Sequence, residues 1–318
     1  MIPMNNILRS VYRIHDAQNQ FNVLTMCRNN EKYIALLCKT LNNFYSMPTH
    51  PWNEMIEQRP PNLHTLNIHS DPLDCIICYD RAEQYSEAES LAHSLHIPII
   101  LVDMCSESLI RPQHLLEGLN AQDPALLYRK PHLRISNSDH IQNSWNKDTV
   151  SIVVPIGIDT DTLQKHDIPE TLVSLDNNVT AQLGAEISSR IGNAYPLIPT
   201  DIEVGQPKSL PRTRYFINTN QTITVKMLEA MSCENVVITI RNIDTENFID
   251  HEKTGILINN LDDILPAINN LEKNQAMRLQ IGKDARKKIV NDHSLEKFTT
   301  KWCAAFSFLK SNFYTPHS

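Results

Sequence analysis

Short apolar runs alternate with amphipathic segments along most of this chain. Runs that are rich in β-branched and other apolar residues, as buried strands are, lie at 21–27, 64–68, 74–79, 98–103, 132–136 and 151–157. Two of the intervening segments, 30–41 and 81–95, repeat their apolar residues every three or four positions, which is typical of helices with one buried face. Continuous apolar strands between helices predict a parallel sheet covered on both faces.

A turn-rich segment at 157–171 precedes a second series of the same kind. Its predicted strands lie at 171–176, 195–199, 214–219, 235–240 and 255–259, and its predicted helices at 179–192, 221–232, 262–272, 274–290 and 294–312. We therefore expect an α/β protein with two doubly wound, Rossmann-like domains. A ligand would bind at the carboxyl ends of the strands, in the cleft between the domains.

The chain length fits this division. Its 318 residues suit two domains of about 150 residues each. We place an N-terminal domain at 1–157 and a C-terminal, ligand-binding domain at 158–292. The last segment, 293–318, is expected to form a helix that packs back toward the N-terminal domain.

Composition narrows the classes of partner. A hydrophobic fraction of 41% with 20% charged residues is typical of globular proteins. The net charge of −7 argues against binding to nucleic acid or to an anionic membrane, because both interactions draw on Lys and Arg. The seven glycines are few for a protein that binds phosphate groups, since such proteins use glycine in the tight turns beside the phosphates.

Cysteine and histidine patterns predict no metal site. Cys75 and Cys78 form a Cys-x-x-Cys pair inside a strand-like run, without the second pair that a zinc site needs, so we expect buried, reduced thiols. The histidines are not spaced as metal ligands, and none is singled out as a catalytic base. No signal peptide or membrane-spanning run is recognised, so a cytoplasmic location is expected.

Four segments carry a more specific signal, and they occur in a meaningful order. They are VVPIGIDTDTL (153–163), YFINTNQ (215–221), QTITVKMLEAMSCENVVIT (221–239) and HEKTGILI (251–258). Together this part of the chain resembles the nucleotide-sugar domain of retaining, family-4-type glycosyltransferases (glycosyltransferase group 1), which have the GT-B fold. In the N-terminal half, NEKYIALLCKTLNNFY (30–45) and EQYSEAESLAHSLHIPIILVD (83–103) are similar to a subset of these enzymes from phages and bacteria.

The resemblance implies a donor site with named residues. Glu229 would accept hydrogen bonds from the ribose of a nucleotide sugar, and Glu246 would lie near the donor sugar. The strand end and helix start would contribute Asn218, Thr219, Asn220 and Gln221. It further implies a nucleoside-diphosphate sugar as the donor substrate, no permanently bound cofactor, and metal-independent transfer with retention.

Several positions depart from the family pattern. Gln221 replaces the first glutamate of the family's Glu-x7-Glu pair, and Glu234 replaces a glycine at a tight turn. In the N-terminal half, Asn30 replaces a histidine, and Asp103 with Met104 replaces a Glu-His pair. These changes fall where the chemistry is expected, so the sequence identifies no catalytic residue.

The basic residues that usually neutralise the diphosphate are also missing after the first strand of the second domain. The segment 174–190 offers only Arg190, about three helical turns too late. Arg28, Arg81 and Arg241 are therefore candidates for contacts to the diphosphate or to the acceptor, and Asn30 and Asp103 are further candidates for such contacts.

Three readings stay open. The first is an active glycosyltransferase with an altered donor pocket and an unidentified acceptor, which could be a glycan, a protein or a modified base. The second is a catalytically degenerate GT-B protein that binds or regulates a protein partner. The third, glycosylation of modified DNA bases, is opposed by the acidic charge balance.

Overall fold

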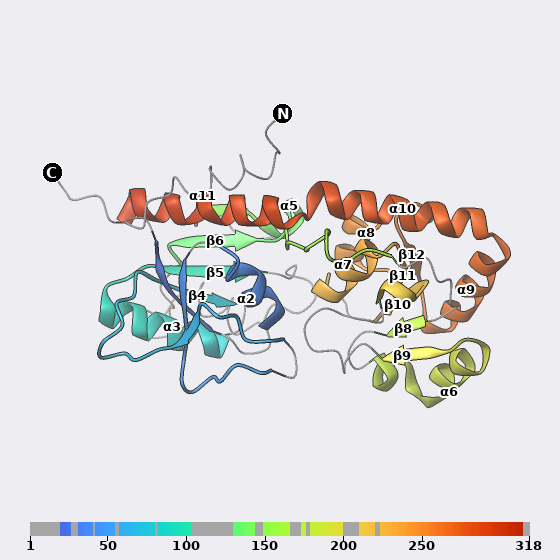
Figure 1. Ribbon diagram of the computed structural model, residues 1–318, viewed down its shortest axis with the longest axis horizontal. Coiled ribbons are helices and arrows are strands. Elements are labelled where there is room, and N and C mark those ends of the chain that lie inside the picture. Colours follow the sequence, from blue (N-terminus) through green and yellow to red (C-terminus); the bar gives the residue numbers. More distant parts are fainter. Residues whose placement is uncertain are drawn as a thin grey trace, which may run out of the picture.

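The computed structural model has two units, each built on a parallel β-sheet (Figure 1). We call the part around the sheet of β1 to β7 the first unit, and the part around β8 to β12 the second unit. The structure describes residues 20–26, 31–40, 42–54, 57–79, 82–103, 130–143, 149–165, 173–175, 179–199, 210–219 and 223–313.

The first unit contains a seven-stranded sheet in the order β3-β2-β1-β4-β5-β6-β7. Its strands are β1 (Asn22–Thr25), β2 (Asn43–Ser46), β3 (Leu63–Thr65), β4 (Cys75–Tyr79), β5 (Ile99–Asp103), β6 (Leu133–Ser136) and β7 (Ser151–Val153). Its helices are α2 (Glu31–Leu37), α3 (Ala82–Leu95) and α5 (Asp139–Asn143). Every residue of the central strands β4 and β5 is buried, as the continuous apolar runs predicted.

The second unit contains a five-stranded sheet in the order β12-β11-β10-β8-β9. Its strands are β8 (Val173–Leu175), β9 (Leu197–Pro199), β10 (Tyr215–Asn218), β11 (Val236–Ile240) and β12 (Ile256–Ile258). Its α-helices are α6 (Val179–Ala194), α7 (Val225–Ser232), α8 (Ile243–Phe248), α9 (Ile264–Lys273) and α10 (Gln275–Asp292), with 3-10 turns η2 (Leu210–Arg212) and η3 (Leu261–Asp263). The last helix, α11 (Leu295–Phe313), lies over the first unit (Figure 1).

The sequence pattern missed two elements. The helix expected over 30–41 ends at Leu37, and the chain then forms strand β2, whose side chains are alternately half-buried and buried. Helix α8 was also missed, because its six residues are too few to show a helical period. The thiols of Cys75 and Cys78 are free and buried, as expected, and burial raises the pKa of Cys75.

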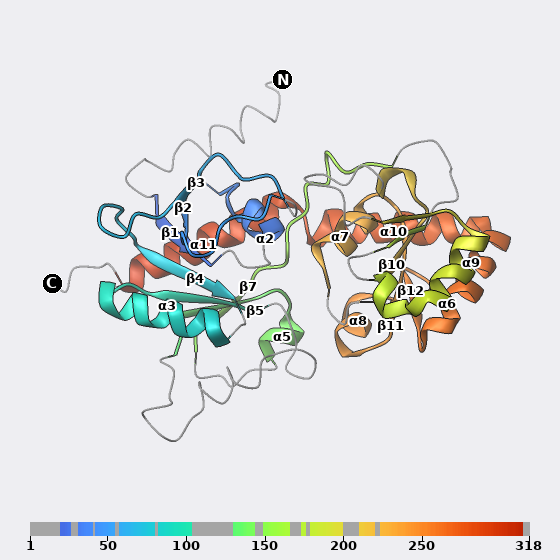
Figure 2. The same cartoon turned by 90° about the horizontal axis from the view of Figure 1, so that it is seen from below.

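The chain crosses between the units twice, first in the segment around Ile158 and again at Ser294, and the two crossings lie side by side. Ile158 and Ser294 form a parallel bridge, with the Ile158 amide 2.7 Å from the His293 carbonyl oxygen. The His293 ring contacts the Ile156 carbonyl oxygen at 2.9 Å, and its pKa is lowered, chiefly by burial. Figure 2 shows the same arrangement from below, with α10 on the second unit and α11 on the first.

Arg286 ties the first crossing to the second unit. From α10, its guanidinium donates to the carbonyl oxygens of Leu163 (2.8 Å), Thr160 (3.2 Å) and Ser232. Ser232 is the last residue of α7, so these bonds also satisfy carbonyl groups at a helix end and in a loop. The position of α7 is thereby coupled to the chain segment that joins the units.

The turn after α7 has the left-handed backbone conformation that glycine favours, although this chain has no glycine there. Glu234, which stands where the family has glycine, has φ of 58°, in the left-handed region. A non-glycine residue in this region costs roughly 1–2 kcal/mol.

We expect Glu234→Gly to raise the free energy of unfolding by about 1 kcal/mol, because glycine adopts this φ without a steric cost. Equilibrium urea denaturation measures the change. Glu234→Ala is the control, since it removes the charge but keeps the Cβ atom. Equal stabilisation by both variants would mean that charge, and not backbone conformation, sets the cost.

None of the helices in the described part of the chain combines the length and apolar character that crossing a bilayer requires.

Candidate functional site

Helix α7 presents Glu229 toward the first unit. The helix begins after Thr224, whose hydroxyl accepts a hydrogen bond from the Met227 amide at 3.1 Å. Met227, Leu228 and Met231 are buried in the core that continues from the second unit into the first. Glu229 lies between these apolar positions and is itself buried, at 8% exposure. A buried carboxylate needs a partner, and the first unit supplies one.

The partner is Lys32, in the first turn of α2. Its Nζ atom donates to both carboxylate oxygens of Glu229, at 2.9 Å and 3.1 Å. The two side chains are 10% and 11% exposed, so the ion pair is largely shielded from solvent. The residues lie 197 positions apart in the sequence, and the pair joins the two units directly.

Opposing effects act on the pKa of Glu229. Burial raises it, and the ammonium group of Lys32 lowers it in part, with a net shift upward from the usual glutamate value. Glu57 also raises it and Lys226 lowers it, both more weakly. Lys32 therefore offsets part of the effect that burial has on this carboxylate.

A small cavity of about 100 Å³ lies beside this pair. Its lining comes from both units and from the crossing between them, including Leu36, Glu57, Asp159 and Val225. Across the same gap, Lys39 Nζ donates to Asp159 Oδ2 at 3.1 Å, and this bond contributes to lowering the pKa of Asp159 despite partial burial. Lys32 and Lys39 of the first unit therefore each form an ion pair with a carboxylate outside that unit.

Of the two described candidates at the end of β10, Asn218 is the more deeply buried. Asn218 is buried at 1% exposure, with its amide nitrogen 3.4 Å from Thr239 Oγ1 and 3.4 Å from Met227 Sδ. It therefore ties β10 to β11 and α7. Thr219 follows it and is half-buried.

Two candidates from the sequence lie together at the end of β11. Arg241 Nη1 donates to Glu246 Oε1 at 2.7 Å, and both side chains are partly exposed. Arg241 and Glu246 therefore already form an ion pair with each other.

Asp103, at the carboxyl end of β5, is fully buried, and its carbonyl oxygen accepts from the Asn137 amide at 3.3 Å.

Five further candidates, Arg28, Asn30, Arg81, Asn220 and Gln221, lie outside the described residues, as does Met104. Among the described residues, no group of His, Cys, Asp or Glu side chains could hold a metal ion.

Beyond Lys39 and Asp159, three described residues that bridge the units were not predicted. Besides Lys32, these are His140 on α5 and Asp244 on α8, with His140 Nε2 3.7 Å from Asp244 Oδ1. Asp244 is buried in the first turn of its helix. Lys32 had a signal, because it stands inside the NEKY segment that carries the N-terminal resemblance. Asp244 had none, because α8 itself was missed, and His140 had none, because the histidines are not spaced as metal ligands.

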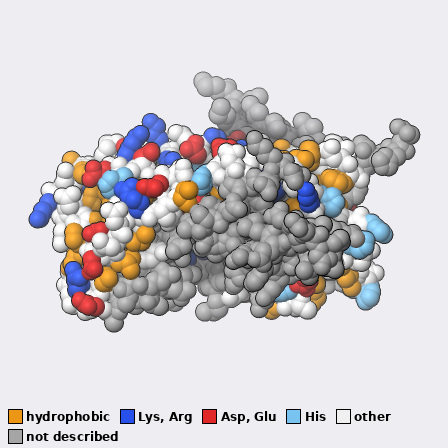
Figure 3. Space-filling view, turned by 180° about the vertical axis from the view of Figure 1, so that it is seen from behind, with side chains coloured by type: hydrophobic (Ala, Val, Ile, Leu, Met, Phe, Trp, Pro, Cys, Tyr) orange, Lys and Arg blue, Asp and Glu red, His pale blue; other side chains and the backbone are white. Residues whose placement is uncertain are grey.

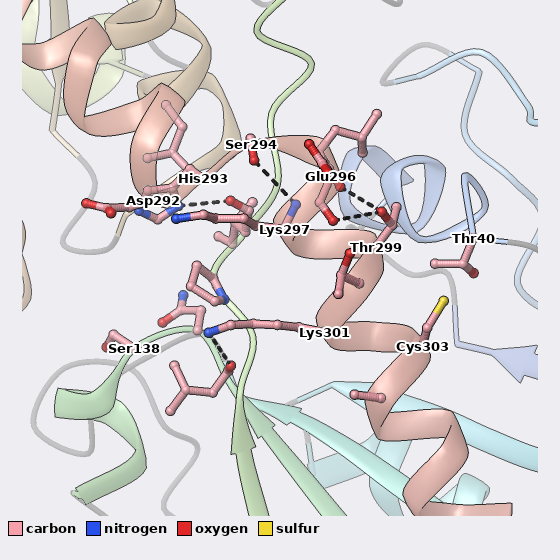
Figure 4. A pocket seen from close by; sticks show the side chains of 18 of the residues that line it. Thr40, Ser138, Asp292, His293, Ser294, Glu296, Lys297, Thr299, Lys301 and Cys303 are labelled. Atoms are coloured by element: carbon pink, nitrogen blue, oxygen red, sulfur yellow. Dashed lines mark hydrogen bonds between the residues drawn. The ribbon is translucent and has the colours of Figure 1, made fainter. Parts of the chain in front are cut away.

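A larger groove, of about 2120 Å³, runs between α11, the crossing segments, α5 and α8. Figure 4 shows Lys301 extending from α11, on the side where Ser138 lies, and its Nζ atom donates to the Val153 carbonyl oxygen at 3.1 Å. Lys297, one turn earlier on α11, donates to the Asn291 carbonyl oxygen. Both ammonium groups thereby contact backbone oxygens at the crossings.

The surface charge is mixed in sign. Figure 3 shows acidic and basic side chains interspersed over the described part of the second unit on that face. Binding to a nucleic-acid backbone relies on a continuous basic surface, so this face does not favour that function.

Part of the sequence of this chain matches a known protein family, and its fold is similar to those of solved structures. Residues 205–304 match the family model described as glycosyl transferase-like. Anabaena HepE, solved with UDP and glucose, is 11% identical with a TM-score of 0.68, covering 91% of this chain and 100% of its own. Sucrose-phosphate synthase of Thermosynechococcus elongatus is 13% identical with a TM-score of 0.66, covering 92% and 99%. A glycosyltransferase of Rickettsia africae is 12% identical with a TM-score of 0.61, covering 92% and 100%.

No curated protein has a significantly similar sequence. The matched segment contains α7 with Glu229, and the structural similarity extends over both units. The resemblance inferred from the sequence is therefore confirmed in its fold and its family match: the chain has the GT-B fold, and residues 205–304 match the glycosyl transferase-like family model.

Proposed function

We propose that this protein is a glycosyltransferase that moves a sugar from a nucleotide-sugar donor to an acceptor. The observation that carries the proposal is the position of Glu229. Its buried carboxylate belongs to the glycosyl transferase-like domain, and it faces the other unit beside a cavity lined by both. HepE, which has a similar fold, was solved with UDP and glucose and also with UDP-glucose, so a uridine nucleotide is the first donor to test.

The chemistry of Glu229 suits a ribose. A carboxylate can accept two hydrogen bonds at once, and the two neighbouring hydroxyls of a ribose can donate them. Such bonds are stronger than those between neutral groups. We assign the donor to the second unit, within 158–292, and the acceptor to the first, within 1–157.

The transfer step follows from this placement. The amide groups at the N-terminus of α7 suit the negative charge of a diphosphate. The leaving diphosphate and fixed dipoles would stabilise an oxocarbenium-like transition state, without a metal ion and with retention at the anomeric carbon. Exclusion of water between the units would direct the sugar to the acceptor and prevent hydrolysis.

Glu229→Gln tests the assignment. We expect UDP affinity to fall at least tenfold, about 1.4 kcal/mol, because a neutral amide offers one acceptor oxygen without charge. Isothermal titration calorimetry with UDP and UDP-glucose measures the loss. Glu186→Gln, on an exposed position of α6, is the matched control and should leave the affinity unchanged.

Two results would count against the proposal. If the folded wild-type protein binds none of UDP, GDP, ADP, CMP or their sugar conjugates at millimolar concentration, the donor site does not exist. If Glu229→Gln binds UDP as tightly as the wild type does, Glu229 does not hold the ribose.

A second function is a GT-B protein that binds a nucleotide or a protein partner without catalysing transfer. One observation favours it: the carboxylate of Glu229 is already occupied by Lys32. Release of UDP from UDP-glucose, followed with and without candidate glycan, protein and modified-base acceptors, distinguishes the two functions. Binding without release would favour the second function.

A further inference from the structure

The ion-pair partner of Glu229 indicates how the donor site could neutralise a diphosphate. Lys32 is a cation of the first unit that reaches the second unit's carboxylate at 2.9 Å, with only 10% of its side chain exposed. In the second unit, segment 174–190, where the resemblance places the residues that neutralise the diphosphate, offers only Arg190. Arg190 is engaged by Asp262 at 2.9 Å, on an exposed surface. Lys32 is therefore a cation that lies beside the proposed donor site but belongs to the first unit.

Binding of a ribose to Glu229 would change the position of Lys32. The carboxylate oxygens that now accept from Nζ would instead accept from the ribose hydroxyls. Lys32 would then be left buried beside a weakened partner, which is strongly unfavourable for a charged group. Of the other carboxylates on the same cavity, Asp159 already accepts from Lys39 at 3.1 Å, and Glu57 accepts from the Gln58 amide at 3.1 Å.

A nucleoside diphosphate solves this problem with its own charge. Its ribose and its phosphates are joined by a single methylene, so a ligand whose ribose lies on Glu229 brings its phosphates to the immediate surroundings of that carboxylate. Lysine binds phosphate as a mobile point charge on a flexible stem, so it can follow a partner over a short distance.

We propose that Lys32 is an exchange residue of the donor site: it neutralises Glu229 in the free protein and moves to the donor's phosphates when the ribose takes Glu229. The inference rests on the proposed function and assigns to the first unit a cation for the donor's diphosphate. It also makes the ion pair between the units dependent on the ligand, so that each donor replaces one cross-unit contact by another.

The test compares UDP with uridine, which has the ribose but no phosphate. In Lys32→Met we expect UDP affinity to fall about tenfold, because the phosphate loses its cation. Uridine affinity should stay unchanged or rise, because the competitor for Glu229 is gone. Lys32→Arg should retain UDP binding. Lys273→Met is the matched control, since it removes an exposed lysine in the last turn of α9, away from the cavity, and it should change neither affinity.

A double variant keeps the test valid if Lys32→Met alone folds poorly around an unpaired carboxylate. In the Glu229→Gln background the charged partner is absent, so a further Lys32→Met substitution reports the phosphate contact alone. The exchange mechanism predicts that it still weakens UDP binding about tenfold. Thermal unfolding of each variant establishes that it is folded.

The outcomes separate the two proposals. The exchange is overturned if Lys32→Met leaves UDP affinity unchanged or tightens it. It is also overturned if adding Lys32→Met to Glu229→Gln does not change UDP affinity. Lys32 would then serve only to join the two units through Glu229. In that case a weakened Glu229→Gln variant would still support the donor site. Absence of UDP binding by the wild type overturns both.

Discussion

Replacing Trp302 by alanine should lower the free energy of unfolding by about 3–5 kcal/mol, the range measured for removing large aromatic side chains from protein cores. Trp302 on α11 is fully buried. Its ring lies 5.4 Å from that of Phe306 and 6.4 Å from that of Phe298, and its Nε1 donates to the Tyr33 hydroxyl at 3.2 Å.

The loss has two parts. Alanine would leave a cavity between α11 and the first unit, and it would remove a hydrogen bond from a buried hydroxyl whose pKa burial already raises. Because Tyr33 is next to Lys32 in α2, the same contact supports the helix that carries the cross-unit ion pair.

Equilibrium urea denaturation followed by circular dichroism measures the change. Trp302→Phe is the matched control: it keeps most of the ring volume but loses the N–H group, so it should cost about 1–2 kcal/mol. A loss below 1 kcal/mol for Trp302→Ala would show that α11 does not stabilise the first unit.

Gly282→Ala should destabilise the protein by about 1–3 kcal/mol, although alanine is the better helix former by about 1 kcal/mol. Gly282 lies inside α10, against the turn that follows α7. A Cβ atom at this position would stand 2.4 Å from the Glu234 carbonyl oxygen, closer than any real contact of that kind. Since the neighbour is backbone, α10 or the turn must move.

The same substitution at Gly192 provides the control. Gly192 lies in the last turn of α6 and is exposed, and among the described residues a Cβ atom there would meet only the Leu197 side chain, with Cδ1 at 3.4 Å. Gly192→Ala should therefore raise stability by up to about 1 kcal/mol. Thermal denaturation midpoints of the two variants should move in opposite directions. An upward shift for both would mean that α10 does not pack closely on the turn.

Local pattern predicted most of the fold. The strands of the second sheet were recognised because each is a short apolar run between helical segments, and the order of motifs indicated the GT-B fold. The elements that were missed are short: β2 follows α2 after only a few residues, and α8 has six residues. An element of that length holds its shape through tertiary contacts, so its own residues carry little periodic signal.

The sequence by itself determined that Glu229 stands in a helix next to an apolar strand, and that Glu234 occupies a turn where glycine is usual. Both follow from residues that are adjacent in the chain. Only the tertiary structure decided which group faces that carboxylate, because Lys32 is 197 positions away and reaches it through the packing of two separate sheets. The same holds for Asp244 with His140 and for Arg286 with the crossing segment. Periodicity reports which face of an element is buried, whereas the partner across an interface depends on how the elements are placed, and that placement is set by the whole core.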